Sequence, residues 1–163
     1  GIGYQIARRC AAFDMKILYH KRTELKDNPS NLELTYVSLD ELLEQSDYVV
    51  TICPLTEETT GLISTKEFAK MKNSAVLVNV ARGPVVDTAA LTTALQEGQI
   101  YAAGLDVTDP EPLPRDHPLL ALNNVTIAPH LGSATIQTRR KMAEISVDNL
   151  LLGLRGESLL HSV

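Results

Sequence analysis

Short runs of β-branched and other apolar residues alternate along this chain with stretches of helical periodicity. The runs occupy residues 16–20, 34–37, 48–53, 75–80, 101–107 and 125–128. Some are apolar at every position, as in Val76-Leu77-Val78, which is typical of strands covered by helices on both faces. Alternation of strands with helices favours a parallel sheet with helical crossovers. We therefore expect an α/β fold.

Helix ends can be recognised between several of these strands. Ser64 is followed three residues later by Glu67, a pair that can satisfy the first free amides of a helix. Asp87 is a good N-cap and Gly98 a good residue to end the same helix. These signals predict helices starting near residues 65 and 88.

Two proline-bearing stretches and one long helical stretch complete the pattern. Residues 27–31 are expected to form a surface turn. Residues 108–118 are expected to form a long loop after a strand, and ligands of open α/β sheets bind at such loops. The periodicity near the C-terminus predicts one helix over residues 134–152, ended by Gly153.

Composition narrows the classes of partner. The 163 residues suffice for one ordinary domain, and no apolar run reaches the roughly 18 residues that cross a bilayer. With 20 acidic and 15 basic residues mixed along the chain, we expect neither nucleic acid nor a membrane surface as a partner. Cys10 and Cys53 have no nearby Cys or His at metal-ligand spacing, so we expect no metal. Buried free thiols favour a cytoplasmic location.

The chain opens on Gly1-Ile2-Gly3, which resembles part of a dinucleotide-binding glycine motif. Ile6 stands where the third glycine of a G-x-G-x-x-G beginning at Gly1 would be. Gly3 can instead be the last glycine, with the other two and their strand upstream. That last glycine allows a helix to pack closely on a strand. The alternative is a helix start with incidental glycines.

A basic cluster lies where such a fold reads the adenosine ribose, about 20 residues beyond the glycines. The residues there are His20, Lys21, Arg22 and Thr23. A 2′-phosphate favours cationic donors, whereas a 2′-hydroxyl favours Asp or Glu. The cluster predicts preference for NADP over NAD, and the alternative is a solvated basic turn.

Three polar segments each follow an expected strand, and such segments converge at one edge of a parallel sheet. Their sequences are N-x-x-R-G at residues 79–83, D-V-x-x-x-E-P at 106–112 and P-H-x-G-S-A-T at 129–135. In order and spacing they resemble the D-isomer-specific 2-hydroxyacid dehydrogenase family. Residues 111–114 and 117–120 are similar to its glyoxylate/hydroxypyruvate reductase branch.

The resemblance spans residue 1 to about residue 157 and implies a domain plan. A Rossmann-type doubly wound parallel sheet lacking its first strand would occupy residues 1–133, the dinucleotide-binding domain. Residues 134–163 would be a helix that returns to a mostly absent substrate domain. We expect the full-length protein to be a homodimer, and this chain alone to be aggregation-prone and inactive because a central strand is missing.

The resemblance also implies the roles of individual side chains. Reduction of a small 2-keto acid needs a hydride, a proton and a cation for the carboxylate. His130 would be the proton donor, Glu111 its hydrogen-bonding partner, and Arg82 the group that binds the substrate carboxylate. Each could instead be an ordinary surface or ion-paired residue.

Further residues are implied as cofactor contacts. Asp106 would lie near the nicotinamide carboxamide, and Cys53, Pro54 and Thr56 beside the adenosine and diphosphate end. The other expected contacts are Gly3, His20, Lys21, Arg22, Thr23, Val80, Ala81, Arg82, His130, Gly132 and Ser133. NADPH is the expected cofactor, with NAD as the alternative. Two other functions stay open: a dinucleotide-sensing, corepressor-like binding protein, and a non-catalytic fragment of the reductase.

Overall fold

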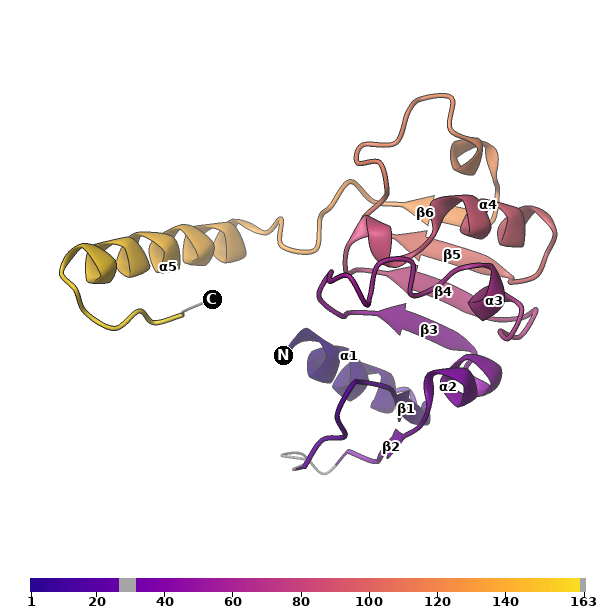
Figure 1. Ribbon diagram of the computed structural model, residues 1–163, viewed down its shortest axis with the longest axis horizontal. Helices are drawn as coiled ribbons and strands as arrows, with labels where there is room; N and C mark the ends of the chain where they lie inside the picture. The colour runs from indigo at the N-terminus through magenta and orange to yellow at the C-terminus, as the bar shows by residue number, and fades with distance from the viewer. Residues whose placement is uncertain (27–31, 162–163) are drawn as a thin grey trace. The chain divides into compact units, whose positions relative to one another are not determined.

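A computed structural model describes residues 1–26 and 32–161 (Figure 1). The chain divides into two compact units, Gly1–Pro129 and His130–Val163. The functional boundary predicted after residue 133 remains a prediction. The turn predicted at residues 27–31 lies outside the described residues.

All six predicted strands are present, each a little shorter than its apolar run. Their bounds are β1 Ile17–Tyr19, β2 Leu34–Tyr36, β3 Tyr48–Thr51, β4 Val76–Asn79, β5 Ala102–Leu105 and β6 Val125–Ile127. At Ala75 and Val107 the run extends further because burial continues past the paired residues, whereas Lys16, His20, Val80 and Tyr101 at the ends of other runs are exposed.

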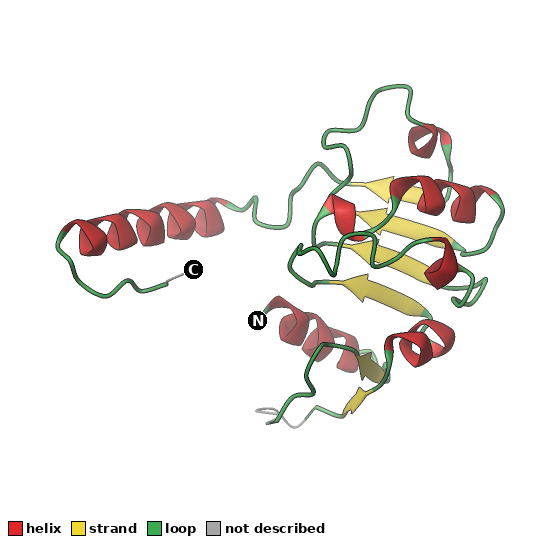
Figure 2. Ribbon diagram, viewed as in Figure 1, coloured by secondary structure: helices red, strands yellow, loops and turns green. Residues whose placement is uncertain are grey.

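The strands form two parallel groups. β3, β4, β5 and β6 pair in that order, and β1 pairs with β2 (Figure 2). Among residues 1–26 and 32–161, β1 pairs only with β2, and β3 pairs only with β4. A doubly wound sheet has such groups on the two sides of its central first strand. The expected α/β architecture with a parallel sheet is confirmed.

One helix precedes the first strand of the first unit, and the others lie between its strands. They are α1 Ile2–Ala11, α2 Leu39–Gln45, α3 Thr65–Phe68 and α4 Thr88–Gln96, with short 3-10 turns at Gly83–Val85 and Pro118–Ala121. The predicted ends of α4 are confirmed, because the Asp87 carboxylate accepts from Ala90 N at 3.0 Å and Gly98 has φ +68°. At α3, the backbone N–H of Ser64 donates to Glu67 at 3.1 Å, as predicted.

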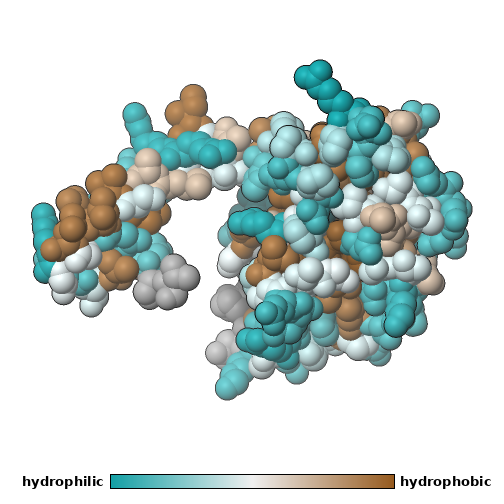
Figure 3. All heavy atoms as spheres, turned by 45° about the horizontal axis from the view of Figure 1, so that its top comes forward, coloured by the Kyte–Doolittle hydropathy of each residue, from teal (hydrophilic) through white to brown (hydrophobic). Residues whose placement is uncertain are grey.

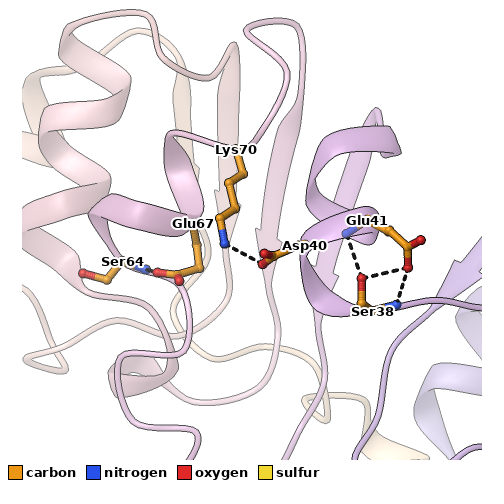
Figure 4. Close-up of polar contacts among 6 residues, drawn as sticks. All are labelled: Ser38, Asp40, Glu41, Ser64, Glu67 and Lys70. Carbon is orange, nitrogen blue, oxygen red and sulfur yellow. Dashed lines mark hydrogen bonds and ion pairs between the residues drawn. The ribbon is translucent and has the colours of Figure 1, made fainter.

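The capping box of α2 was not predicted. The Ser38 hydroxyl accepts from Glu41 N, and the Glu41 carboxylate accepts from Ser38 N at 2.9 Å (Figure 4). The Glu41 carboxylate accepts from Ser38 N and also from the Ser38 hydroxyl at 2.7 Å, and these two bonds, the backbone amide first, lower the pKa of Glu41. An ion pair between Asp40 and Lys70 then joins α2 to the turn after α3.

One face of the four-stranded sheet holds the core, because α2, α3 and α4 pack on it. Leu77 of β4 lies at its centre and is 0% exposed. The other core residues include Leu43, Val49, Ile63, Phe68, Leu91, Leu95, Ile100, Ala103, Leu105 and Leu119. The opposite face, carrying Val76 and Val78, is only half-buried. Coverage by helices on both faces, expected from the sequence, is therefore incomplete in this unit.

The second unit contains α5, Ile136–Leu154. The Thr135 side chain caps it by accepting from Thr138 N at 3.2 Å. The predicted stop at Gly153 is wrong, since the helix continues through it and Gly156 adopts the left-handed conformation at φ +70°. Glycine costs a helix only about 1 kcal/mol, so it ends one only where the left-handed turn forms.

The surface of α5 carries exposed apolar side chains, including Ile136, Leu150 and Leu154 (Figure 3). None of its residues is buried. No helix among the described residues, α5 included, is both long and apolar enough to span a membrane. That α5 returns to a substrate domain remains a prediction.

Candidate functional site

Polar segments follow β3, β4 and β5 at one edge of the sheet. The carboxyl ends of these parallel strands all point the same way, to the left in Figure 1. The segments are residues 53–60 after β3, 80–83 after β4 and 106–112 after β5. Ligands of open α/β sheets bind outside this edge.

The side chain of Asn79 organises the segment after β4. It is 1% exposed and makes three hydrogen bonds. Its Oδ1 accepts from Thr51 Oγ1 at 2.8 Å and from Ala81 N at 3.1 Å, and its Nδ2 donates to the Arg82 carbonyl at 3.0 Å. The amide therefore closes the turn that carries Val80, Ala81 and Arg82.

Arg82 leaves this turn as an exposed side chain. Its Nη1 donates to the Ala81 carbonyl at 2.7 Å, which folds the guanidinium back over its own turn. A guanidinium carries five N–H donors, so this one bond leaves capacity to bind a carboxylate at two points.

Gly83 brings the segment after β5 onto the Arg82 turn. A Cβ at Gly83 would lie 1.9 Å from the Thr108 carbonyl oxygen and 2.3 Å from its carbon, so only glycine permits this approach. Thr88 Oγ1 adds a bond to the Asp109 carbonyl at 2.9 Å. A cavity beneath this contact, lined by Gly83, Thr108 and core residues such as Leu91, holds only about 10 Å³.

Glu111 lies in the segment after β5, which Gly83 allows to approach the Arg82 turn. Its carboxylate accepts from Thr108 N at 3.2 Å, which places it beside the residue whose carbonyl Gly83 approaches. Asp106 is half-buried directly after β5, and its backbone N–H donates to the Asn79 carbonyl at 3.0 Å. The structure thus brings together the segments of Arg82, Asp106 and Glu111.

The basic cluster follows β1 and is exposed, Thr23 included. The His20 ring stacks on Tyr36 of β2 at 6.3 Å between centroids, and its Nδ1 donates to the Val37 carbonyl at 3.0 Å. The Tyr36 hydroxyl donates to the Lys21 carbonyl at 3.1 Å. Tyr36 therefore holds the turn of the cluster, a role that only the strand register reveals.

The segment after β3 carries an acid, Glu58, that interacts with the charge of Arg22 in this cluster. Thr56 Oγ1 donates to Glu58 at 2.7 Å, and Thr59 Oγ1 donates to the Pro54 carbonyl at 2.7 Å. The pKa of Glu58 is lowered chiefly by the Thr56 hydroxyl, with a smaller contribution from the charge of Arg22. Arg22 therefore lies near this segment, and Glu58 is an acid that the sequence reasoning missed.

Two other predicted contacts lie nearby in the first unit. Gly3 sits in α1, where an added Cβ would be 2.9 Å from Ile52 Cδ1, so the helix packs closely on the residue after β3. Cys53 is half-buried, and burial raises the pKa of its thiol. A protonated thiol is a poor nucleophile. Cys53 can therefore line the site but is unsuited to covalent catalysis.

The third motif opens the second unit. His130 has φ +56°, a left-handed conformation that few residues other than glycine adopt. Such strain often marks functional positions. Gly132 is exposed and Ser133 half-buried in the turn before α5. That His130, Gly132 and Ser133 join Arg82 and Glu111 remains a prediction.

Metal ligation has no candidate in the described part of the chain. No group of three or more His, Cys, Asp or Glu side chains there could hold a metal ion.

Comparison with known proteins supplies the family. The sequence model of the NAD-binding domain of D-isomer specific 2-hydroxyacid dehydrogenases matches residues 1–132. Glyoxylate/hydroxypyruvate reductase B of Escherichia fergusonii is 51% identical over 156 residues, which are 95% of this chain and 48% of that protein.

Solved structures agree with the sequence match. An NADPH-dependent glyoxylate/hydroxypyruvate reductase from Sinorhizobium meliloti, in complex with NADP and malonate, aligns with TM-score 0.92 and 39% identity over 99% of this chain and 50% of its own. D-lactate dehydrogenase with NAD⁺ from Lactobacillus jensenii aligns with TM-score 0.86 and 35% identity over 99% and 52%. The chain spans about half the length of the curated relatives it matches. With its sequence, fold and motif order in agreement, the chain belongs to the D-isomer-specific 2-hydroxyacid dehydrogenase family.

Proposed function

We propose that the full-length protein reduces a small 2-keto acid, glyoxylate or hydroxypyruvate, to the D-2-hydroxy acid with NADPH. The observation that carries this proposal is the locked contact between the Arg82 turn and the Glu111 segment at the carboxyl edge of the sheet. The names of the relatives agree with it.

Each residue has a distinct task in the proposed reaction. Arg82 binds the carboxylate of the keto acid with a planar pair of donors and orients C2. His130 gives a proton to the carbonyl oxygen as C2 is reduced, and Glu111 orients the imidazole. When bound, the nicotinamide cofactor supplies the hydride. Asp106 would accept a hydrogen bond from the carboxamide of the nicotinamide and so help to hold the ring in one orientation.

The preference for NADPH rests on the turn after β1. His20, Lys21 and Arg22 are exposed there, and no Asp or Glu occupies residues 20–23 to accept from a ribose hydroxyl. Tyr36 holds the backbone of this turn. Glu58 opposes the preference because a carboxylate near Arg22 competes with a phosphate for its charge.

Steady-state kinetics of the full-length protein test both parts. We expect glyoxylate reduction with a higher kcat/KM for NADPH than for NADH, and equal or better use of NADH would refute the cofactor assignment. Replacing His130 by Ala should lower kcat by about 10²–10⁴-fold, the usual contribution of an acid catalyst. Replacing the exposed His161 by Ala is the matched control. A loss within about threefold for His130→Ala would remove its catalytic role.

We also propose that the full-length protein is a cytoplasmic homodimer that acts on a small molecule. Family resemblance supports this assembly. Sedimentation velocity of the full-length protein should give the mass of two chains, and a monomer active at the same concentration would contradict it.

A further inference from the structure

The buried amide of Asn79 uses both its oxygen and its nitrogen in hydrogen bonds. At 1% exposure it has little access to water, so each unmade hydrogen bond would carry a desolvation cost. The backbone fixes which end of the amide is the oxygen, because Ala81 N–H can only donate and the Arg82 carbonyl can only accept. Thr51 Oγ1 adds a hydrogen bond to Oδ1 at 2.8 Å, so the amide is held in one orientation.

That orientation determines the path of the next three residues. Oδ1 accepts from Ala81 N at 3.1 Å, and Nδ2 donates to the Arg82 carbonyl at 3.0 Å. Both bonds start from one side chain, so the peptide unit before Ala81 and the one after Arg82 keep a fixed relation. Gly83 then lies against the Thr108 carbonyl, where there is no room for the turn to shift.

We propose that Asn79 is a positioning residue for Arg82, setting the point from which the guanidinium reaches the substrate carboxylate. This inference rests on the proposed function. Asn79 touches neither substrate nor cofactor in this account, and it acts through the backbone of Arg82.

The chemistry of the turn explains why an amide is required. The position needs one acceptor for Ala81 N and one donor for the Arg82 carbonyl, and an ionised carboxylate offers acceptors only. Asn79→Asp keeps the size and the acceptor but places an oxygen against the Arg82 carbonyl. Asn79→Ser removes both bonds without adding a charge. It takes the place of Asn79→Asp in the test if the aspartate variant does not fold.

A second asparagine provides a matched control. Asn124 precedes β6 at the opposite, amino-terminal edge of the sheet, and its Nδ2 donates to the carbonyls of Leu95 and Tyr101, both at 3.2 Å. Asn124→Asp makes the same chemical change and breaks bonds of the same kind. It should lower the melting temperature without altering substrate binding.

The experiment uses the full-length protein, with KM for glyoxylate, the Kd of NADPH from its fluorescence, and the melting temperature. We expect Asn79→Asp and Asn79→Ser to raise KM for glyoxylate by about 10–100-fold, because small displacements of a binding group are costly. The Kd of NADPH should rise by less than KM for glyoxylate, because Val80 and Ala81 are only two of many expected cofactor contacts, whereas Arg82 is the group proposed to bind the carboxylate. Loss of folded protein alone would lower the rate and leave both constants unchanged. Asn124→Asp should leave both constants within about twofold.

A double-mutant cycle decides whether the effect passes through Arg82. In an Arg82→Gln background, Asn79→Asp should cause little further rise in KM, since the group that it positions is gone. If the increases in KM for glyoxylate caused by the two substitutions were additive, the inference would be overturned. A normal KM for Asn79→Asp, with a raised KM for Arg82→Gln, would also overturn it. If Arg82→Gln itself leaves KM for glyoxylate unchanged, the proposed function fails with it.

Discussion

The Arg82 end and the His20 end of the site are built in opposite ways. At the Arg82 end, a buried amide and a glycine without room for a Cβ lock two segments together. At the His20 end, an exposed turn is held by a ring stack and two hydrogen bonds to backbone carbonyls. The strands beneath differ as well, since β4 holds fully buried residues and β1 and β2 hold none.

The difference follows from what each end is proposed to bind. Hydride transfer needs reacting groups held in place, and small displacements there are costly. A 2′-phosphate is recognised mainly by charge, which tolerates a more mobile, solvated setting. Substitutions should therefore act on geometry at the first end and on charge at the second.

The largest effect is expected from Gly83→Ala. Its Cβ would overlap the Thr108 carbonyl, so the Glu111 segment must move away from Arg82. We expect kcat/KM for glyoxylate to fall by about 10²-fold or more in the full-length protein. Gly104→Ala is the control, because its Cβ would meet Val78 Cγ2 at an ordinary 3.9 Å. Equal losses of kcat/KM in Gly83→Ala and Gly104→Ala would show that the activity does not depend on the close approach at Gly83.

Core truncation should separate the two strand groups by stability. Leu77 of β4 is 0% exposed, so Leu77→Ala should lower the free energy of unfolding by about 2–5 kcal/mol. Leu18 of β1 is half-buried, and Leu18→Ala should cost less. Denaturant unfolding of the full-length protein measures both. A larger loss at Leu18 would mean that the β1–β2 group is the better packed of the two.

Arg22→Ala should act on cofactor choice alone. Losing one charged hydrogen bond to a phosphate costs about 1.5–3 kcal/mol, so the ratio of kcat/KM for NADPH to that for NADH should fall by about tenfold or more. Lys72→Ala, which removes a cation paired with Asp47 at 2.8 Å away from the cluster, should leave the ratio unchanged. A ratio unaffected by Arg22→Ala would exclude this residue from phosphate binding.

The smallest effect is expected at the cap of α4. Asp87→Ala should lower the free energy of unfolding by about 1 kcal/mol. Hydrogen bonding to Ala90 N, chiefly, lowers the pKa of Asp87 in the folded protein below its ordinary value of 3.8. Its stabilisation is therefore present at neutral pH and is lost as the pH falls from 3.8 through the folded value.

The difference between wild type and Asp87→Ala should accordingly shrink in acid. Urea unfolding at neutral pH and below pH 3.8 measures it. A difference independent of pH would show that the carboxylate charge plays no part in the cap.

Periodicity and helix signals predicted the elements of the fold well. The six strands and the ends of α4 depend on local patterns, which a sequence displays directly. The end of α5 was placed wrongly because Gly153 and Gly156 are equally plausible stops, and only the backbone conformation distinguishes them. The capping pair of α2 is visible as Ser38 and Glu41, so a closer search could have found that helix.

The supporting contacts of the site could not be predicted in the same way. The motifs identified Arg82 and Glu111, but the approach of Gly83 to Thr108 joins residues far apart in the chain. The pairing of Tyr36 beside Tyr19 depends on the register of two strands. Burial of Asn79 depends on neighbouring strands too, so its role as a turn-holding amide emerges only in three dimensions.

A crystal structure of the full-length protein with NADP and oxamate, an unreactive analogue of glyoxylate, tests the joint action of Arg82, Glu111 and His130 most directly. We predict that the Arg82 guanidinium and the His130 imidazole both lie within about 2.7–3.2 Å of oxamate oxygens, with Glu111 bonded to the imidazole. Oxamate bound away from Arg82, or His130 facing solvent with the ligand in place, would contradict the account.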